Sequence, residues 1–203
     1  SDNTLVKSSL DDAGVDTGAE ARDRRRLFEA RDLALGGLFG ALGIVVPMIF
    51  HALGPGVGPI FLPMYLPILA LGALASWEVA LVVGAATPLM SSVLTGMPPL
   101  APPVALLMAF ELAGLATATS LARSARLGLW PALVVGIIAA RIAGVVALLT
   151  VGRALGYDKG VVDYALLSMF VAWPGILLQL TVVPGAVYAI ERTSIIGSRW
   201  KKG

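Results

Sequence analysis

Apolar positions dominate the chain from Leu33 onward, in long runs separated by short polar stretches or by stretches rich in Gly and Pro. A helix needs about 20 mostly apolar residues to cross the hydrocarbon core of a bilayer, and most of these runs approach that length. The pattern predicts six membrane-spanning helices, at residues 33–50, 60–75, 79–94, 103–121, 129–151 and 164–190. We therefore expect an all-α integral membrane protein folded as a six-helix bundle.

The second predicted helix is short, and Pro63 and Pro67 interrupt it. Proline has no backbone N–H and leaves a carbonyl unpaired when it lies inside a helix. Membrane helices tolerate this loss, because neighbouring helices and water can satisfy the freed carbonyl. The prolines therefore do not exclude a spanning helix at residues 60–75.

The polar ends of the chain define its organisation. Residues 1–30 hold several acidic residues and an Arg-rich cluster at 22–26, which suits an anionic membrane surface. We expect a cytoplasmic N-terminal tail at 1–30 that is disordered or forms an interfacial helix. The six-helix membrane domain follows at 31–192, and a cytoplasmic C-terminal tail follows at 193–203.

Basic residues are unevenly distributed over the predicted loops. Six Lys or Arg precede the first apolar run, two lie in the loop with Arg123 and Arg126, and four follow the last run, so twelve fall on one side. Only Arg153 and Lys159 fall on the other side. Because cytoplasmic loops carry the excess of Lys and Arg, we expect both termini to be cytoplasmic.

Composition narrows the possible functions. Only 14% of the residues are charged, against about 25% in soluble domains, and the lack of a basic groove rich in aromatic residues argues against nucleic-acid binding. The chain has no cysteine and one histidine, which excludes thiolate and His-His metal sites. It has no GxxxxGK[ST] motif, so it does not bind ATP by a P-loop. We expect no metal, no cofactor and no enzymatic activity.

Two ionisable residues lie in the middle of predicted spans. Glu111 interrupts the fourth apolar run and Arg141 interrupts the fifth. A lone charge in hydrocarbon costs at least about 3 kcal/mol, so such residues usually face the bundle interior and find a partner. We expect Glu111 and Arg141 to meet, either as part of a ligand site or as an ion pair that only fixes helix packing.

Four further residues are candidates for contact with a ligand. Gln179 is polar in the middle of a span and could hydrogen-bond a ligand or a neighbouring helix. Tyr65 and Trp173 could form apolar walls against a ring system, although aromatic residues at these depths also anchor proteins in lipid. His51 ends the first predicted helix, where it could contact a ligand or simply lie at the interface.

Small residues recur four positions apart on two predicted helices. The first helix carries Gly36 with Gly40, and Gly37 with Ala41. Such spacing lets another helix approach closely, either within the bundle or from another subunit. On the fifth helix the series Gly136, Ala140 and Gly144 is best interpreted as internal packing. Gly37 and Ala41 remain candidates for docking a partner.

Three blocks of sequence resemble a known family. They are FLPMYLPILA at 61–70, PLMSSVLTGMPP at 88–99 and FELA at 110–113. Together with the six-helix plan, they resemble the substrate-binding S components of energy-coupling factor (ECF) vitamin transporters over about residues 30–192. The N-terminal tail has no counterpart in this resemblance.

The resemblance implies a multi-pass protein of a prokaryotic cell membrane with both termini inside. It implies a ligand pocket near the outer face, covered by the loops at 51–59, 96–103 and 152–160. It also implies a complex with a transmembrane coupling subunit and two cytoplasmic ATPases. Family members dock through two alanines spaced by four on the first helix. The matching positions here are Gly37 and Ala41, so one alanine is replaced by glycine.

We therefore expect a high-affinity substrate-binding subunit of an ECF-type ABC transporter that imports a vitamin or cofactor-like small molecule. Glu111, Arg141 and Gln179 would supply the directional contacts, in a cavity that is otherwise mostly apolar. The alternative is a self-sufficient secondary carrier or channel that uses the intramembrane Glu/Arg pair. The sequence does not identify the ligand.

Overall fold

The computed structural model describes residues 29–50, 52, 60–101, 103–156 and 172–193, which contain helices and no strand. The chain divides into two units, 1–34 and 35–203. In the first unit, the described residues 29–34 are helical, and Arg31 Nη1 lies 3.9 Å from Asp32 Oδ1. All other features below belong to the second unit. Residues 1–28 of the predicted tail at 1–30, residues 194–203 of the predicted tail at 193–203, His51, and residues 164–171 of the sixth predicted helix lie outside the described residues.

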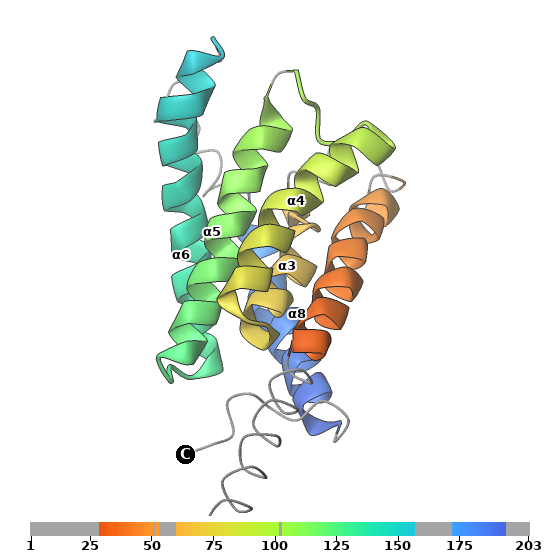
Figure 1. The fold of residues 1–203 in the computed structure, drawn as a ribbon, viewed down its shortest axis with the longest axis vertical. Helices are drawn as coiled ribbons and strands as arrows, with labels where there is room; N and C mark the ends of the chain where they lie inside the picture. Colours follow the sequence, from red (N-terminus) through yellow and green to blue (C-terminus); the bar gives the residue numbers. More distant parts are fainter. Residues whose placement is uncertain (1–28, 51, 53–59, 102, 157–171, 194–203) are drawn as a thin grey trace, which may run out of the picture. The chain divides into compact units, whose positions relative to one another are not determined.

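The described elements are six α-helices and one π-helical turn (Figure 1). Five spans are long and apolar enough to cross a membrane, so the chain is a multi-pass membrane protein whose described part is all-helical. In chain order the elements are the first helix (Glu29–Phe50), α3 (Tyr65–Leu74), α4 (Trp77–Thr95), α5 (Val104–Ser124), α6 (Leu129–Ala147), the π-helix η1 (Leu148–Gly152) and α8 (Trp173–Arg192).

The second predicted span is shorter than expected. Its helix α3 has 10 residues, or about 15 Å at 1.5 Å per residue, roughly half of the hydrocarbon thickness. Leu62 has a positive φ of 47°, and the N–H of Tyr65 donates to the Leu62 carbonyl at 2.9 Å, so the chain turns just before the helix. Pro67 is the third residue of α3, where a missing N–H costs no helical hydrogen bond.

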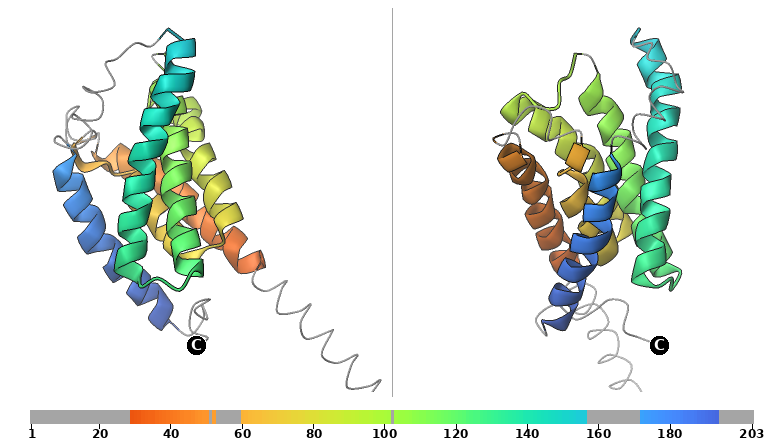
Figure 2. Two further views of the ribbon diagram at one scale, coloured as in Figure 1. Left: turned by 90° about the vertical axis from the view of Figure 1, so that its left-hand side faces the viewer. Right: turned by 180° about the vertical axis from the view of Figure 1, so that it is seen from behind.

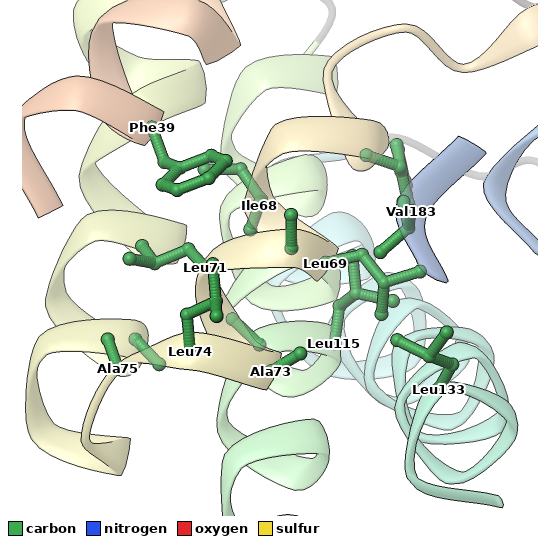
Figure 3. Close-up of a cluster of buried hydrophobic side chains, with 14 of the residues drawn as sticks. Phe39, Ile68, Leu69, Leu71, Ala73, Leu74, Ala75, Leu115, Leu133 and Val183 are labelled. Atoms are coloured by element: carbon green, nitrogen blue, oxygen red, sulfur yellow. The ribbon is translucent and has the colours of Figure 1, made fainter. Parts of the chain in front are cut away.

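α3 forms the centre of the core. Nine of its ten residues are buried. Figure 3 shows its apolar side chains between those of the first helix, α5, α6 and α8; the labelled neighbours from these helices are Phe39, Leu115, Leu133 and Val183. Because lipid tails are as apolar as leucine, this core is held by close packing more than by exclusion from water. A short helix enclosed in this way gives Tyr65, at its first position, a fixed place.

Glycines bring three helices into backbone contact with α5. A Cβ built at Gly72 of α3 would lie 2.6 Å from the Ala116 carbonyl oxygen. The same construction at Gly84 of α4 falls 2.7 Å from the carbonyl oxygen of Leu112, and at Gly136 of α6 it falls 2.8 Å from that of Leu115. No larger residue fits at these positions without moving a backbone. α5 is therefore held from three sides.

From residue 35 on, the helices alternate in direction, α3 included (Figures 1 and 2). The turn between α5 and α6 and the end of α8 lie at one end of the bundle, which we call the basic end because it carries Arg123, Arg126 and Arg192. Arg123 Nη2 lies 2.8 Å from Glu191 Oε1 there, joining α5 to α8. The loop at 96–103 and the end of α6 lie at the opposite end.

Candidate functional site

Glu111 is the most deeply buried charge of α5, with a side chain only 3% exposed. The Tyr65 hydroxyl donates a hydrogen bond to Glu111 Oε2. Arg141 Nη1 lies 3.7 Å from the same oxygen. The predicted meeting of Glu111 and Arg141 is therefore confirmed, and it includes a third residue. We call Tyr65, Glu111 and Arg141 the polar cluster.

Tyr65 makes contacts that the sequence did not predict. The sequence suggested an apolar wall, whereas the structure directs the hydroxyl onto a carboxylate. Its ring also faces the guanidinium of Arg141, whose Cζ lies 5.7 Å from the ring centroid, within the range of a cation–π contact. A buried tyrosine usually finds a partner for its hydroxyl. Tyr65 therefore contacts both charges of the pair.

Because Gly144 has no side chain, the side chain of Glu111 fits beside it. A Cβ built on Gly144 would lie 2.8 Å from both Cγ and Cδ of Glu111, and it would overlap the carboxylate itself. The sequence assigned Gly136, Ala140 and Gly144 together to internal packing. That assignment holds for Gly136, which contacts α5 directly. Gly144 instead makes room for a charged side chain, and its position one turn after Arg141 could have indicated this role.

The charges of the polar cluster sum to zero if both side chains are ionised. Separation of such a pair is costly because each charge would be left alone in a medium of low dielectric. The Arg141 side chain is 18% exposed, and its buried Nε has no hydrogen-bond partner among the described residues. Arg141 thus keeps at least one donor that the protein does not use in this part of the chain.

Gln179 is another buried polar side chain with an unused donor. It is 1% exposed, and its Nε2 has no hydrogen-bond partner within the described ranges. It belongs to the buried face of α8 that also carries Gly175, where a Cβ would lie 2.7 Å from the Phe61 carbonyl oxygen. The start of α8 therefore packs on the backbone just before α3. From the sequence, Gln179 could also have bonded to a neighbouring helix. Among the described residues, its Nε2 makes no such hydrogen bond.

Trp173 does not join this group. It begins α8 and is 59% exposed, which fits the alternative of an aromatic residue at the lipid surface. Of the predicted site residues, Gln179, Tyr65 and Glu111 are thus buried in the bundle, and Arg141 is partly buried beside them.

The two small-residue faces of the first helix have separate surroundings. Gly36 and Gly40 face α4: a Cβ at Gly36 would lie 2.9 Å from Val79 Cγ1, and one at Gly40 would lie 3.2 Å from Val83 Cγ1. Gly37 and Ala41 are exposed, and a Cβ at Gly37 would have no atom within 4 Å. Of the two predicted pairs, the second is therefore open to a neighbour in the membrane.

The loop after α4 is tied back to its own helix. Ser91 Oγ donates to the Met97 carbonyl at 2.7 Å, and Thr95 Oγ1 reaches the same carbonyl at 3.1 Å. The N–H of Ala105 then donates to the Pro99 carbonyl at 3.1 Å. In the described part of this predicted covering loop, Met97 and Pro99 are thus held by hydrogen bonds to the helices on either side. Residues 53–59 and 157–160 of the other two loops lie outside the described residues.

The chemistry available in this region is hydrogen bonding and charge pairing. No group of three or more His, Cys, Asp or Glu residues that could hold a metal ion occurs among the residues described. The polar cluster and Gln179 instead place a few directional groups inside an apolar bundle, as small-molecule sites do.

The chain matches no protein-family model, no curated protein and no solved structure.

Proposed function

We propose that this chain is the substrate-binding membrane subunit, or S component, of an ECF-type importer for a vitamin or cofactor-like small molecule. The observation that carries the proposal is the polar cluster, which lies inside a bundle that is mostly apolar. Ionisable residues inside a membrane protein mark functional sites by default. The unused donors of Arg141 and Gln179 add groups that a ligand could satisfy.

The proposed orientation places both termini in the cytoplasm. The alternating directions of the helices and the twelve-to-two charge bias both support it. Glu111 lies seven residues after the start of α5 and thirteen before its end at Ser124. It therefore belongs to the half of the bundle away from the basic end. In this orientation, that half is the outer one, where a ligand would arrive.

The proposed partners are a transmembrane coupling subunit and two cytoplasmic ATPases. The sequence has no P-loop of its own, so ATP-driven import requires a partner that has one. The exposed face at Gly37 and Ala41 would let a helix of the coupling subunit approach closely. The organism's cell membrane is the proposed location.

The test is uptake by proteoliposomes that contain the chain with or without its coupling module. Radiolabelled candidates, among them biotin, pantothenate and folate, would be supplied outside, with ATP inside. We expect uptake of one of them only when both the module and ATP are present. The alternative carrier rests on the same Glu/Arg pair; uptake by the chain alone, driven by an ion gradient, would favour it and reject the importer.

A further inference from the structure

In the polar cluster, the carboxylate of Glu111 is engaged by protein groups, whereas Arg141 keeps a nitrogen that has no hydrogen-bond partner among the described residues. Glu111 Oε2 accepts the Tyr65 hydroxyl and faces Arg141 Nη1. The rest of its carboxylate fills the space beside Gly144. Glu111 is therefore engaged by the protein itself. Its part is to position Arg141 and to balance the charge of that residue.

Two nitrogen donors, one on α6 and one on α8, are left unused. Arg141 Nε and Gln179 Nε2 are both buried and have no partner among the described residues. Neither nitrogen can accept a hydrogen bond. They belong to α6 and α8, which contact each other and both contact α3. A buried donor without a partner is costly, so a ligand that fits this region offers acceptors.

Charge balance restricts the kind of acceptor. The cluster is neutral when Glu111 and Arg141 are both ionised. A ligand carboxylate or phosphate would bring a net negative charge into a site within the membrane, where an unbalanced charge is strongly disfavoured. An amide, ureido or ring carbonyl would satisfy the same donors without that charge.

From these observations we infer that the ligand presents an uncharged hydrogen-bond acceptor, of the amide, ureido or ring-carbonyl class, to Arg141 and Gln179. The inference rests on the proposed function and adds the chemistry of the ligand group that enters the site. An ionised group elsewhere on the ligand would have to remain outside the cluster.

The test compares matched probes on the purified full-length chain in lipid nanodiscs. Three pairs replace a carboxylate by an uncharged group: nicotinate and nicotinamide, pantothenate and pantothenol, and biotin and biotinamide. Affinities are measured by isothermal titration calorimetry. Molecules that co-purify with the chain are identified by native mass spectrometry. We expect the uncharged member of any binding pair to bind at least as tightly as the anion, and any co-purified molecule to carry a free carbonyl acceptor.

A variant pair tests the residue assignment. Gln179→Met keeps the length of the side chain and removes both donors, so affinity should fall about tenfold, as expected for one buried hydrogen bond. Thr181→Val is the matched control, because Thr181 is exposed on the same helix and its hydroxyl bonds its own helix at Leu177. This control should leave affinity unchanged.

Failure of the inference is distinguishable from failure of the proposed function. Tighter binding of an anionic probe than of its uncharged partner overturns the inference, even when ATP-dependent uptake is intact. Undiminished affinity in folded Gln179→Met also overturns it. If no probe binds, nothing co-purifies and the coupled complex transports nothing, the proposed function fails and the inference fails with it. The probe comparison uses the wild-type chain, so it is decisive even if the variant does not fold.

Discussion

The Tyr65 hydroxyl donates its hydrogen bond to the same carboxylate oxygen of Glu111 that faces Arg141. One oxygen atom therefore links three helices, because Tyr65 belongs to α3, Glu111 to α5 and Arg141 to α6. The tyrosine supplies a neutral donor where the guanidinium is 3.7 Å away, a long distance for a charge-assisted hydrogen bond. Removal of the Tyr65 hydroxyl should therefore affect both Glu111 and Arg141.

Tyr65→Phe should lower the free energy of unfolding by about 1–3 kcal/mol, because the buried carboxylate loses a donor and the ring remains. Thermal unfolding of the purified protein in nanodiscs measures the change. Tyr188→Phe is the control, because Tyr188 lies exposed on α8. Equal stabilities of the two variants would show that the hydrogen bond contributes nothing measurable.

Glu111→Gln and Arg141→Met should each destabilise the fold by about 3–5 kcal/mol, since either change leaves its partner's charge without compensation. The double variant should recover part of the loss. A double-mutant cycle on unfolding free energies isolates the interaction between the two residues. Strict additivity would argue that the pair does not interact, whatever its separation.

Gly144→Ala should displace the Glu111 carboxylate, because the added Cβ overlaps it. We expect a loss of about 1–3 kcal/mol in stability, as for other overpacked sites, together with weaker ligand binding. Gly185→Ala is the matched control: it is also a helical glycine, but its Cβ would meet nothing within 4 Å. That change should be neutral, or stabilising by up to about 1 kcal/mol. A stabilised Gly144→Ala protein would contradict the proposed role of the glycine.

Gly37→Trp and Ala41→Trp should block ATP-dependent uptake and leave ligand binding to the isolated chain intact, because both positions are exposed on the first helix and bulk there prevents close helix approach. Uptake in proteoliposomes and calorimetric affinity separate the two effects. Ile142→Trp, which adds similar bulk at an exposed position of α6, should transport normally. Unimpaired uptake by the first two variants would exclude this docking face.

Single cysteines should report the proposed orientation, since the chain has no native cysteine. A membrane-impermeant maleimide applied to intact cells should label Gly56→Cys. It should label Ser124→Cys, at the basic end, only after permeabilisation. The reverse pattern would place the polar cluster in the cytoplasmic half and remove the basis for ligand capture from outside.

Much of the fold could be predicted from the lengths of the apolar runs alone. The five long spans agree with the apolar runs, because a run near 20 residues has few other uses in a protein. The start of the helix in the second run was harder to predict, because residues 60–75 are mostly apolar and Pro63 and Pro67 do not exclude a spanning helix. The turn that shortens α3 depends on the positive φ of Leu62, and a leucine gives no local signal for that conformation.

Some contacts of the candidate site could likewise be predicted from the sequence, and others could not. Glu111 and Arg141 could be paired from sequence, because opposite charges at similar depth in hydrocarbon have strong reason to meet. The bond from Tyr65 depends on where α3 begins, and the contact of Gly144 depends on how α6 rotates against α5. For Trp173, which is exposed at the start of α8, the sequence left a ligand wall and a lipid anchor both open, because an aromatic residue suits lipid and protein surroundings equally well. Such details are set by tertiary packing, which local pattern does not contain.

The glycine contacts around α5 also determine which parts of this protein could be redesigned. Gly72, Gly84 and Gly136 leave no spare volume on the three sides of α5 that they cover, so a library aimed at those faces would yield mostly misfolded chains. α8 offers more freedom, because Gly185 has open space around it and only part of the helix is buried. An engineer would therefore keep the scaffold of Glu111 and the buried face of α8 that carries Gln179 unchanged, and would vary the face of α8 that carries Gly185.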